Sequence, residues 1–278
     1  MNEEKRAVAP VRPAAAYIGG KRRLGELLAR RIEASRHETY AEPFVGMGGV
    51  FLRRRWAPRR EVINDISRDV ATLFRILQRH YPQFMDTLKF QITSRSEFDR
   101  LASSNPDTLT DLERAARFLY LQRLAFGGKV AGRNFGVESS GGARFDVTKL
   151  GSVLEEIHDR LSGVTIECLP WADFVDRYDA PGTLFYLDPP YWGSEMDYGA
   201  GVFGRTDFSR LALRLSRISG RFMLSVNDVP QTRDVFKQFA IETLETRYTV
   251  SGKWTDVSEI LVTGPSTEPL ATANDRLF

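Results

Sequence analysis

The sequence predicts an α/β protein built on a mostly parallel, Rossmann-like sheet. Short apolar runs alternate with amphipathic stretches over much of the 278 residues, as they do when strands and crossover helices follow one another. A glycine-rich turn follows the first of these runs, in "AEPFVGMGG", and a later run ends in "LDPPY". Open sheets of this class bind ligands at the carboxyl ends of their strands, so both motifs fall where a site is expected.

The individual elements follow from the spacing of the apolar residues. We expect strands at residues 39–45, 61–66, 164–169, 183–188, 221–226, 241–250 and 259–263. We expect helices at residues 21–36, 68–85, 112–126, 150–161 and 208–219. The chain is long enough for these elements to share one large buried core.

One segment breaks the alternation of strand and helix. Residues 69–150 read as mostly helical and end in the stretch "FGGKVAGRNFGVESSGGARF", which is rich in Gly, Arg and Asn. We therefore expect residues 1–68 and 151–278 to form one catalytic, cofactor-binding domain. Residues 69–150 are expected to be an insertion in that domain, ending in a loop.

Composition and charge exclude several classes of protein. Cys168 is the single cysteine, so an internal disulfide is excluded, and no cluster of Cys or His has the spacing of a metal site. We see no export signal and no apolar run of membrane-spanning length, and we expect a soluble protein of the cytoplasm.

Positive charge gathers in the first sixty residues of a chain whose formal net charge is +3. The basic runs lie at residues 21–23, 30–31, 53–55 and 59–60. Such runs suit a surface that faces phosphates, although each of them also suits the solvated face of a helix.

The glycine-rich turn indicates a nucleoside ligand. Gly46 and Gly48 let the backbone turn tightly, and Asp65 follows nineteen positions after Gly46, where a carboxylate can accept both hydroxyls of a ribose. Glu42 would repel a pyrophosphate but suits a cationic amino group, such as that of S-adenosylmethionine. The alternatives are a plain turn, a helix-capping Asp65 and a surface Glu42.

The motif "DPPY" suits methyl transfer to an amino group. The lone pair of adenine N6 is delocalised into the ring, and two hydrogen-bond acceptors at its hydrogens would free that pair for attack. Asp188 and the carbonyl of Pro189 can supply these acceptors, Pro190 stiffens the chain, and Tyr191 offers a face for an extruded base. The structural alternative is a rigid turn after a strand.

The order of these motifs resembles that of a known family. "YIGGKRRL", "EPFVGMGG", an acidic strand end, an insertion and then "DPPY" are similar to the adenine-specific DNA methyltransferases of the Dam type, the D12 class of N6-adenine methyltransferases. The resemblance extends over nearly the whole chain. It implies a Rossmann-like fold that depends on S-adenosylmethionine, with the insertion as the target-recognition region.

The resemblance also assigns residues to the cofactor. Asp65 would hold the ribose, Asp173 would bind the adenine amino group, and Phe174 would lie beside the adenine ring. The full expected cofactor set is Tyr17, Lys21, Glu42, Phe44, Gly46, Gly48, Asp65, Asp173, Phe174 and Asp188. Tyr17 could equally be a core residue and Asp173 a surface acid, and Tyr17 stands where the family often has Trp.

The insertion is expected to bind the DNA. "LYLQRLAFGGKVAGRNFGV" resembles the start of the family's recognition region, and its DNA-binding candidates are Arg123, Lys129, Arg133 and Asn134. Arg and Asn match the edges of guanine and adenine, which favours base reading by Arg133 and Asn134. The alternative is that Arg133 contacts phosphate and Asn134 caps a turn.

The sequence thus predicts a site-specific methyltransferase that acts on adenine N6 in double-stranded DNA after flipping the base. Methylation of RNA or of cytosine N4 is a rival within the same chemistry, and a DNA-binding relic without activity is a rival outside it. We expect a place at the nucleoid of a bacterium or phage-infected cell, with a partner restriction endonuclease as one possible context. The recognition sequence and the oligomeric state stay open.

Overall fold

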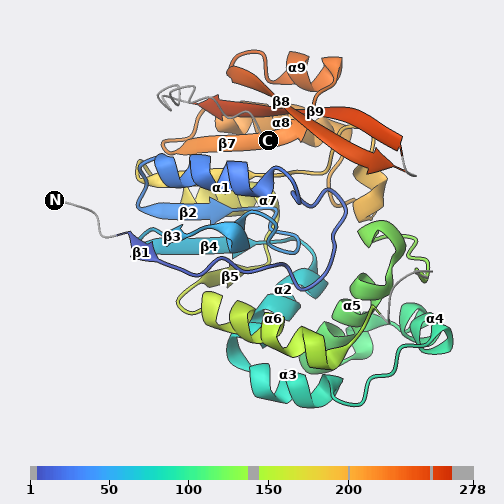
Figure 1. Cartoon of the computed structure of the whole chain (residues 1–278). Coiled ribbons are helices and arrows are strands. Elements are labelled where there is room, and N and C mark those ends of the chain that lie inside the picture. Colours follow the sequence, from blue (N-terminus) through green and yellow to red (C-terminus); the bar gives the residue numbers. More distant parts are fainter. Residues whose placement is uncertain (1–4, 137–143, 200, 251–252, 265–278) are drawn as a thin grey trace.

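A seven-stranded sheet forms the centre of the molecule (Figure 1). The computed structural model of the chain describes residues 5–136, 144–199, 201–250 and 253–264. The strand order is β5-β4-β2-β6-β7-β9-β8. The strands are β2 Thr39–Glu42, β4 Arg60–Asn64, β5 Thr165–Glu167, β6 Thr183–Leu187, β7 Arg221–Asn227, β8 Ala240–Val250 and β9 Lys253–Gly264. All seven expected strands are present, and the expected α/β, Rossmann-like fold is confirmed.

The order in which the chain adds strands to the sheet reverses beside β2. The chain runs from β2 outward to β4 and β5 and then returns to the other side of β2 as β6, and all of these pairings are parallel. β7 continues the parallel set, while β9 pairs antiparallel with both β7 and β8. The carboxyl ends of β2 and β6 flank the point of reversal, which is where such sheets form their ligand crevice.

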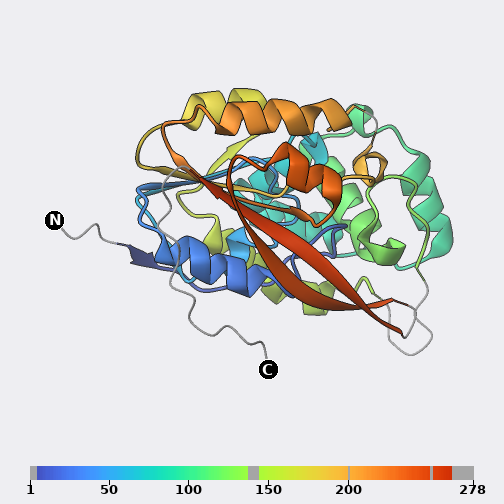
Figure 2. The ribbon, with the colours of Figure 1, turned by 90° about the horizontal axis from the view of Figure 1, so that it is seen from above.

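Helices cover both faces of the sheet (Figure 2). Helix α1 (Gly25–Ala34) lies on one face, and α7 (Trp171–Tyr178) and α8 (Arg205–Leu215) lie on the other. The short α9 (Pro230–Val235) precedes β8. Helix α1 begins later than expected, because residues 22–24 form a turn in which the carbonyl of Lys21 accepts from the Gly25 amide at 2.7 Å. Lys21 therefore lies outside the helix.

The predicted insertion is helical and lies beyond the β5 edge of the sheet (Figure 1). It contains α2 Arg68–Arg79, α3 Tyr81–Leu88, α4 Arg95–Ser103, α5 Asp111–Leu124 and α6 Val147–Arg160. The single helix expected at residues 68–85 is wrong, since the chain breaks at His80 and a new helix starts. Pro82 explains the break: it has no amide hydrogen for an inner turn but fits the first turn of α3.

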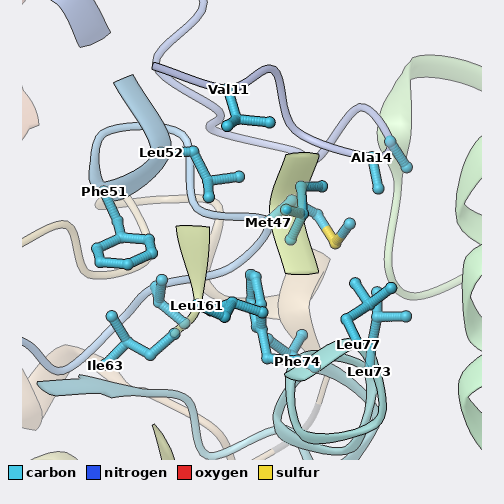
Figure 3. Close-up of a cluster of buried hydrophobic side chains, with 14 of the residues drawn as sticks. Val11, Ala14, Met47, Phe51, Leu52, Ile63, Leu73, Phe74, Leu77 and Leu161 are labelled. Atoms are coloured by element: carbon cyan, nitrogen blue, oxygen red, sulfur yellow. The ribbon is translucent and has the colours of Figure 1, made fainter. Parts of the chain in front are cut away.

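The insertion shares its core with the sheet. The expected boundaries at 68/69 and 150/151 fall within α2 and α6, and one hydrophobic cluster joins these helices to the glycine loop and the N-terminal segment. In Figure 3, side chains of this cluster converge from all of these parts, with Met47 of the glycine loop between Val11 and Leu73. The predicted insertion and the sheet are therefore packed together around the glycine loop.

Short elements complete the described chain. β1 Arg6–Ala7 and β3 Trp56–Ala57 form a small antiparallel ladder, and 3-10 turns lie at Phe51–Arg53, Pro106–Thr108, Phe126–Gly128 and Glu195–Tyr198. Within the residues that the structure describes, no helix has the length and apolar character needed to cross a membrane.

Candidate active site

A cavity of about 470 Å³ opens at the carboxyl ends of β2, β4 and β6. Its size lies in the range of small-molecule sites. Eight residues expected at the site line it: Tyr17, Lys21, Glu42, Phe44, Gly46, Asp65, Asp188 and Pro190. Motifs that are far apart in the sequence therefore meet in one place, as the strand order requires.

The glycine loop is tied to Asp65. The Gly46 amide donates to Asp65 Oδ2 at 2.9 Å, and the Ser67 amide donates to Oδ1 at 2.9 Å. Burial raises the pKa of Asp65 to about 6. Gly46 has a φ of 50°, and a Cβ there would lie 3.0 Å from the ring of Tyr17, so both backbone and space demand glycine. Gly48 closes the turn, because its amide donates to the carbonyl of Val45 at 2.8 Å, and it does not line the cavity.

Lys21 and Asp188 form the central contact of the site. Lys21 is 2 % exposed, and its Nζ donates to Asp188 Oδ1 at 2.5 Å and to the Tyr191 hydroxyl at 2.7 Å. Ser225 also donates to Asp188 Oδ1, at 3.3 Å. Burial raises the pKa of Asp188 to about 6, although the Lys21 ammonium lowers it. These contacts fix the carboxylate through one of its oxygens at the cavity wall.

Glu42 lies on the floor of the cavity with almost no exposure. Its Oε2 accepts from the Tyr40 hydroxyl at 2.6 Å. Burial, with a smaller effect from the nearby Asp188, raises the pKa of Glu42 to about 8. At neutral pH the carboxyl group is therefore mostly protonated when no cation lies beside it. Lys21, Glu42, Asp188 and Glu259 are called the acidic cluster below.

A second group of buried charges lies behind Tyr40. Glu61 Oε1 accepts from Arg54 at 2.8 Å, and both Glu61 oxygens accept from Arg160, at 2.7 and 2.8 Å. The Arg54 guanidinium lies 3.8 Å from the centroid of the Tyr40 ring, which connects this group to Glu42. Arg54, Glu61 and Arg160 are called the arginine cluster below.

The "DPPY" segment is anchored to the end of β7. The backbone of Trp192 exchanges two hydrogen bonds of 3.0 Å with the side chain of Asn227. Pro189 and Pro190 are buried, and the Tyr191 ring lies 4.7 Å from Lys21 Nζ, measured to its centroid. The segment is thus held at both ends, by Lys21 on one side and Asn227 on the other.

Asp173 and Phe174 do not line the cavity, in contrast to the expectation for them. In the first turn of α7, Asp173 is exposed, while Phe174 is fully buried with its ring 4.9 Å from that of Tyr178. The reason is the helical spacing, which puts Phe174 on the same inward face as Trp171 and turns Asp173 away.

Three residues at the site were not anticipated. Tyr198 lines the cavity, donates to the carbonyl of Ile18 at 3.0 Å and lies against Tyr17 with 6.1 Å between ring centroids. Ser225 and the nearly buried Glu259 contact Asp188 and Lys21 from the second half of the sheet. An acid that opens an apolar strand, as in "EILVT", was a usable signal for Glu259; Tyr198 and Ser225 carry none.

The expected DNA-binding residues divide into two groups. Lys129 and Asn134 are exposed. Arg123 is committed to the protein itself, since it donates to the carbonyl of Ala14 at 2.6 Å and twice to that of Arg144. These bonds occupy the Arg123 guanidinium, and its contact with DNA stays a prediction. Arg133 is half-buried and donates to Gln122 at 3.2 Å.

A buried amide joins helix α5 and the turn after it to the "GGK" segment. Gln122 Nε2 donates to the carbonyls of Ala16 and Gly128, at 2.9 and 2.7 Å. The Ile18 amide also donates to Gly128, at 3.0 Å, and a Cβ at Gly128 would lie 3.0 Å from the Tyr17 nitrogen. The two segments are therefore in backbone contact beside the cavity. Within the described residues, no cluster of His, Cys, Asp and Glu suits a metal ion.

The fold and this set of residues define an α/β protein with a cavity lined by carboxylates at the carboxyl ends of its strands. The comparison with known families goes further: the D12 class N6 adenine-specific DNA methyltransferases match residues 17–250. This chain belongs to that family. The resemblance found in the sequence is confirmed, and so is adenine-specific methylation of DNA as the activity of its class.

Relatives agree with the family. A Type II methyltransferase of Lactococcus lactis subsp. cremoris is 26% identical over 91% of this chain and 95% of its own length. A DNA adenine methylase of Haemophilus influenzae is 24% identical over 86% of this chain and 88% of its own. Among solved structures, a putative RNA methyltransferase of Pyrococcus horikoshii overlaps 86% of this chain and 79% of its own with 9% identity and a TM-score of 0.37, a likeness too distant to bear on function.

Proposed function

We propose that this chain transfers a methyl group from S-adenosylmethionine to N6 of a flipped adenine at a specific site in double-stranded DNA. The observation that carries the proposal is Asp188 at the carboxyl end of β6, fixed by Lys21 and Ser225 on the wall of the cavity. Family membership supplies the reaction class. The acidic lining supports a cationic methyl donor.

The residues present suit S-adenosylmethionine as the methyl donor. Glu42, Asp65 and Asp188 bring three carboxyl groups to one cavity, which favours a ligand with a cationic amino group, a ribose and a sulfonium. In the proposal Asp65 holds the ribose hydroxyls, Glu42 lies beside the amino group, and the faces of Tyr17 and Phe44 line the cavity. When bound, S-adenosylmethionine supplies a methyl group on a positively charged sulfur.

Asp188 has two tasks in the proposed reaction. It first accepts a hydrogen bond from N6, with the Pro189 carbonyl as the second acceptor, so that the N6 lone pair turns toward the methyl carbon. The new nitrogen–carbon bond forms as the sulfur–carbon bond breaks, and positive charge moves to N6. Asp188 then stabilises this charge and receives the proton that N6 sheds.

Contact with the duplex is proposed for residues outside the cavity wall. Tyr191 is proposed to stack on the flipped base, and Lys129, Arg133 and Asn134 are proposed to contact the DNA from the recognition segment. Arg123 is left out, because its guanidinium holds backbone carbonyls. The cellular context in the proposal is the nucleoid of a bacterium or phage-infected cell, with a partner endonuclease that cuts the unmethylated site.

Labelled methyl donor separates this function from its rivals. The protein is incubated with duplex DNA, with the same DNA lacking adenine, and with RNA, and the modified base is identified by mass spectrometry. We expect N6-methyladenine in duplex DNA only. Label in RNA or on cytosine would replace the substrate in the proposal, and a protein that binds DNA but transfers no label would be the inactive relic.

Genome-wide mapping tests the role of the recognition segment. Methylated adenines are mapped for wild type, Arg133→Ala and Asn134→Ala at matched activity. Loss of a base contact costs about 1 to 3 kcal/mol and relaxes one position of the site, whereas loss of a phosphate contact weakens all sequences alike. An unchanged pattern in both variants would overturn base reading by these two residues.

A further inference from the structure

Glu259 is a buried carboxylate next to the reaction site, outside the cavity wall. It lies on β9 opposite Asn227, so that the antiparallel strand brings it to the carboxyl end of β7. The side chain is about as buried as that of Lys21, and its Oε2 lies 3.6 Å from Lys21 Nζ. A carboxylate removed from water at this point has a high cost unless a charge partner offsets it.

Besides the direct ion pair, the hydroxyl of Tyr191 links Glu259 to Lys21. The oxygen of the Tyr191 hydroxyl accepts from Lys21 Nζ at 2.7 Å, so its hydrogen is free to donate, and it bonds to Glu259. Glu259 thus contacts the ammonium directly and through the tyrosine hydroxyl.

The sign of the charge near Asp188 decides what Lys21 does to the reaction. Methyl transfer moves positive charge onto N6, next to Asp188. An ammonium 2.5 Å from that carboxylate would offset its charge and oppose the developing cation. With Glu259 present, one ammonium is shared by two carboxylates, and a net negative charge stays at the site.

We propose that Glu259 is a positioning residue for methyl transfer, which holds Lys21 and the Tyr191 hydroxyl and offsets the charge of the ammonium, so that the net charge beside N6 stays negative. The inference rests on the proposed function, because it assigns Asp188 to the amino group that is methylated. Lys21 then orients Asp188, and Glu259 counters the positive charge that Lys21 brings to the site.

Two substitutions separate charge from shape. Glu259→Gln keeps the size of the side chain and removes its charge, whereas Glu259→Asp keeps the charge. We expect kcat on duplex DNA to fall roughly tenfold or more in Glu259→Gln, with KM for DNA little changed, and to stay within about threefold of wild type in Glu259→Asp. Glu242→Gln is the control, since Glu242 lies on the neighbouring β8 with an exposed side chain that pairs with Arg31.

Cofactor binding provides a measurement that needs no turnover. S-adenosylmethionine carries a sulfonium and S-adenosylhomocysteine a neutral thioether, so the ratio of their dissociation constants reports the charge of the site. Calorimetry is expected to show that Glu259→Gln reduces the preference for the sulfonium by roughly three- to tenfold. Glu242→Gln is expected to leave the ratio unchanged.

Tyr191→Phe keeps the inference testable if Glu259→Gln fails to fold. It removes the hydroxyl between Lys21 and Glu259 and keeps the ring, so we expect kcat to fall while the thermal midpoint stays near that of wild type. The inference is overturned if Glu259→Gln, or Tyr191→Phe in its place, retains kcat within about twofold, or if Glu259→Asp loses as much as Glu259→Gln. A wild-type protein that methylates no adenine would overturn the proposed function instead.

Discussion

The acidic cluster and the arginine cluster are both buried groups of charge on neighbouring strands, but they are completed differently. In the arginine cluster one carboxylate receives hydrogen bonds from two guanidinium groups, whose faces also lie over Tyr40 and Phe51. In the acidic cluster two carboxylates, those of Asp188 and Glu259, share the ammonium of Lys21, and the third acid, Glu42, has a pKa of about 8. The carboxylate of the first cluster is paired by two guanidinium groups of the protein, whereas the second cluster lies at a cavity that is proposed to receive a cationic ligand. We therefore expect the first cluster to contribute to stability and the second to ligand binding.

The largest expected effect is on catalysis, at Asp188. Asp188→Asn keeps the volume of the side chain and removes the acceptor charge, so we expect the methylation rate to fall about a thousandfold or more. The rate is measured with labelled donor, and circular dichroism checks the fold. Asp234→Asn, which changes an exposed acid on α9, serves as control. Activity within a few-fold of wild type would remove Asp188 from the reaction.

A substitution in the arginine cluster should lower the stability of the protein and have little direct effect on the methylation reaction. Glu61→Gln leaves Arg54 and Arg160 buried without a carboxylate, and we expect the free energy of unfolding to fall by about 3 to 5 kcal/mol. Urea titration followed by circular dichroism measures the change. Glu26→Gln, which removes an exposed partner of Arg30, should have little effect. If Glu61→Gln were as stable as wild type, the arginine cluster would not differ from the acidic cluster in its contribution to stability.

A Glu-to-Gln substitution in the acidic cluster should instead raise the free energy of unfolding. The folded-state pKa of Glu42, about 8, lies above its ordinary value of 4.5, so its contribution to stability is full in acid and is lost as pH rises toward 8. Glu42→Gln cannot ionise, and without ligand we expect it to exceed wild type by about 2 to 4 kcal/mol at pH 8.5.

Thermal unfolding at pH 5 and pH 8.5 measures this difference. The advantage of Glu42→Gln should nearly vanish at pH 5, where wild-type Glu42 is protonated in the folded protein. A gain of the same size at both values of pH would show that packing, and not ionisation, is responsible.

The smallest of these effects concerns Asp65, which both lines the cavity and braces the glycine loop. Asp65→Ala should weaken binding of S-adenosylmethionine by about 1.5 to 3 kcal/mol, the worth of hydrogen bonds to a charged group. Calorimetry measures the affinity, and Asp159→Ala, an exposed acid of α6, is the control. Unchanged affinity would assign Asp65 to the loop alone.

Local pattern predicted the sheet and most of the cavity because strands and their carboxyl ends are local features. Pro43 and Pro82 set the ends of β2 and α2 through the amide hydrogen that proline lacks, and both were expected inside their elements, at residues 39–45 and 68–85. Glu259 depended on the pairing of β9 with β7, which the sequence does not fix. Whether Arg123 meets DNA or a carbonyl depends on the neighbours that folding brings to it.

Gln122 donates to the carbonyls of Ala16 and Gly128, and this contact, called the joint here, has a consequence for protein engineering. A chimera that takes its recognition segment from a relative will keep the register of Tyr17 and Lys21 only if the transplanted piece restores both the buried amide and the glycine. Crossover points after Gly128 leave the joint intact, whereas a cut within α5 replaces one half of it. Under the role in sequence choice that is proposed for the insertion, we therefore expect the modular unit for changing sequence preference to be shorter than the helical insertion and to begin at Lys129.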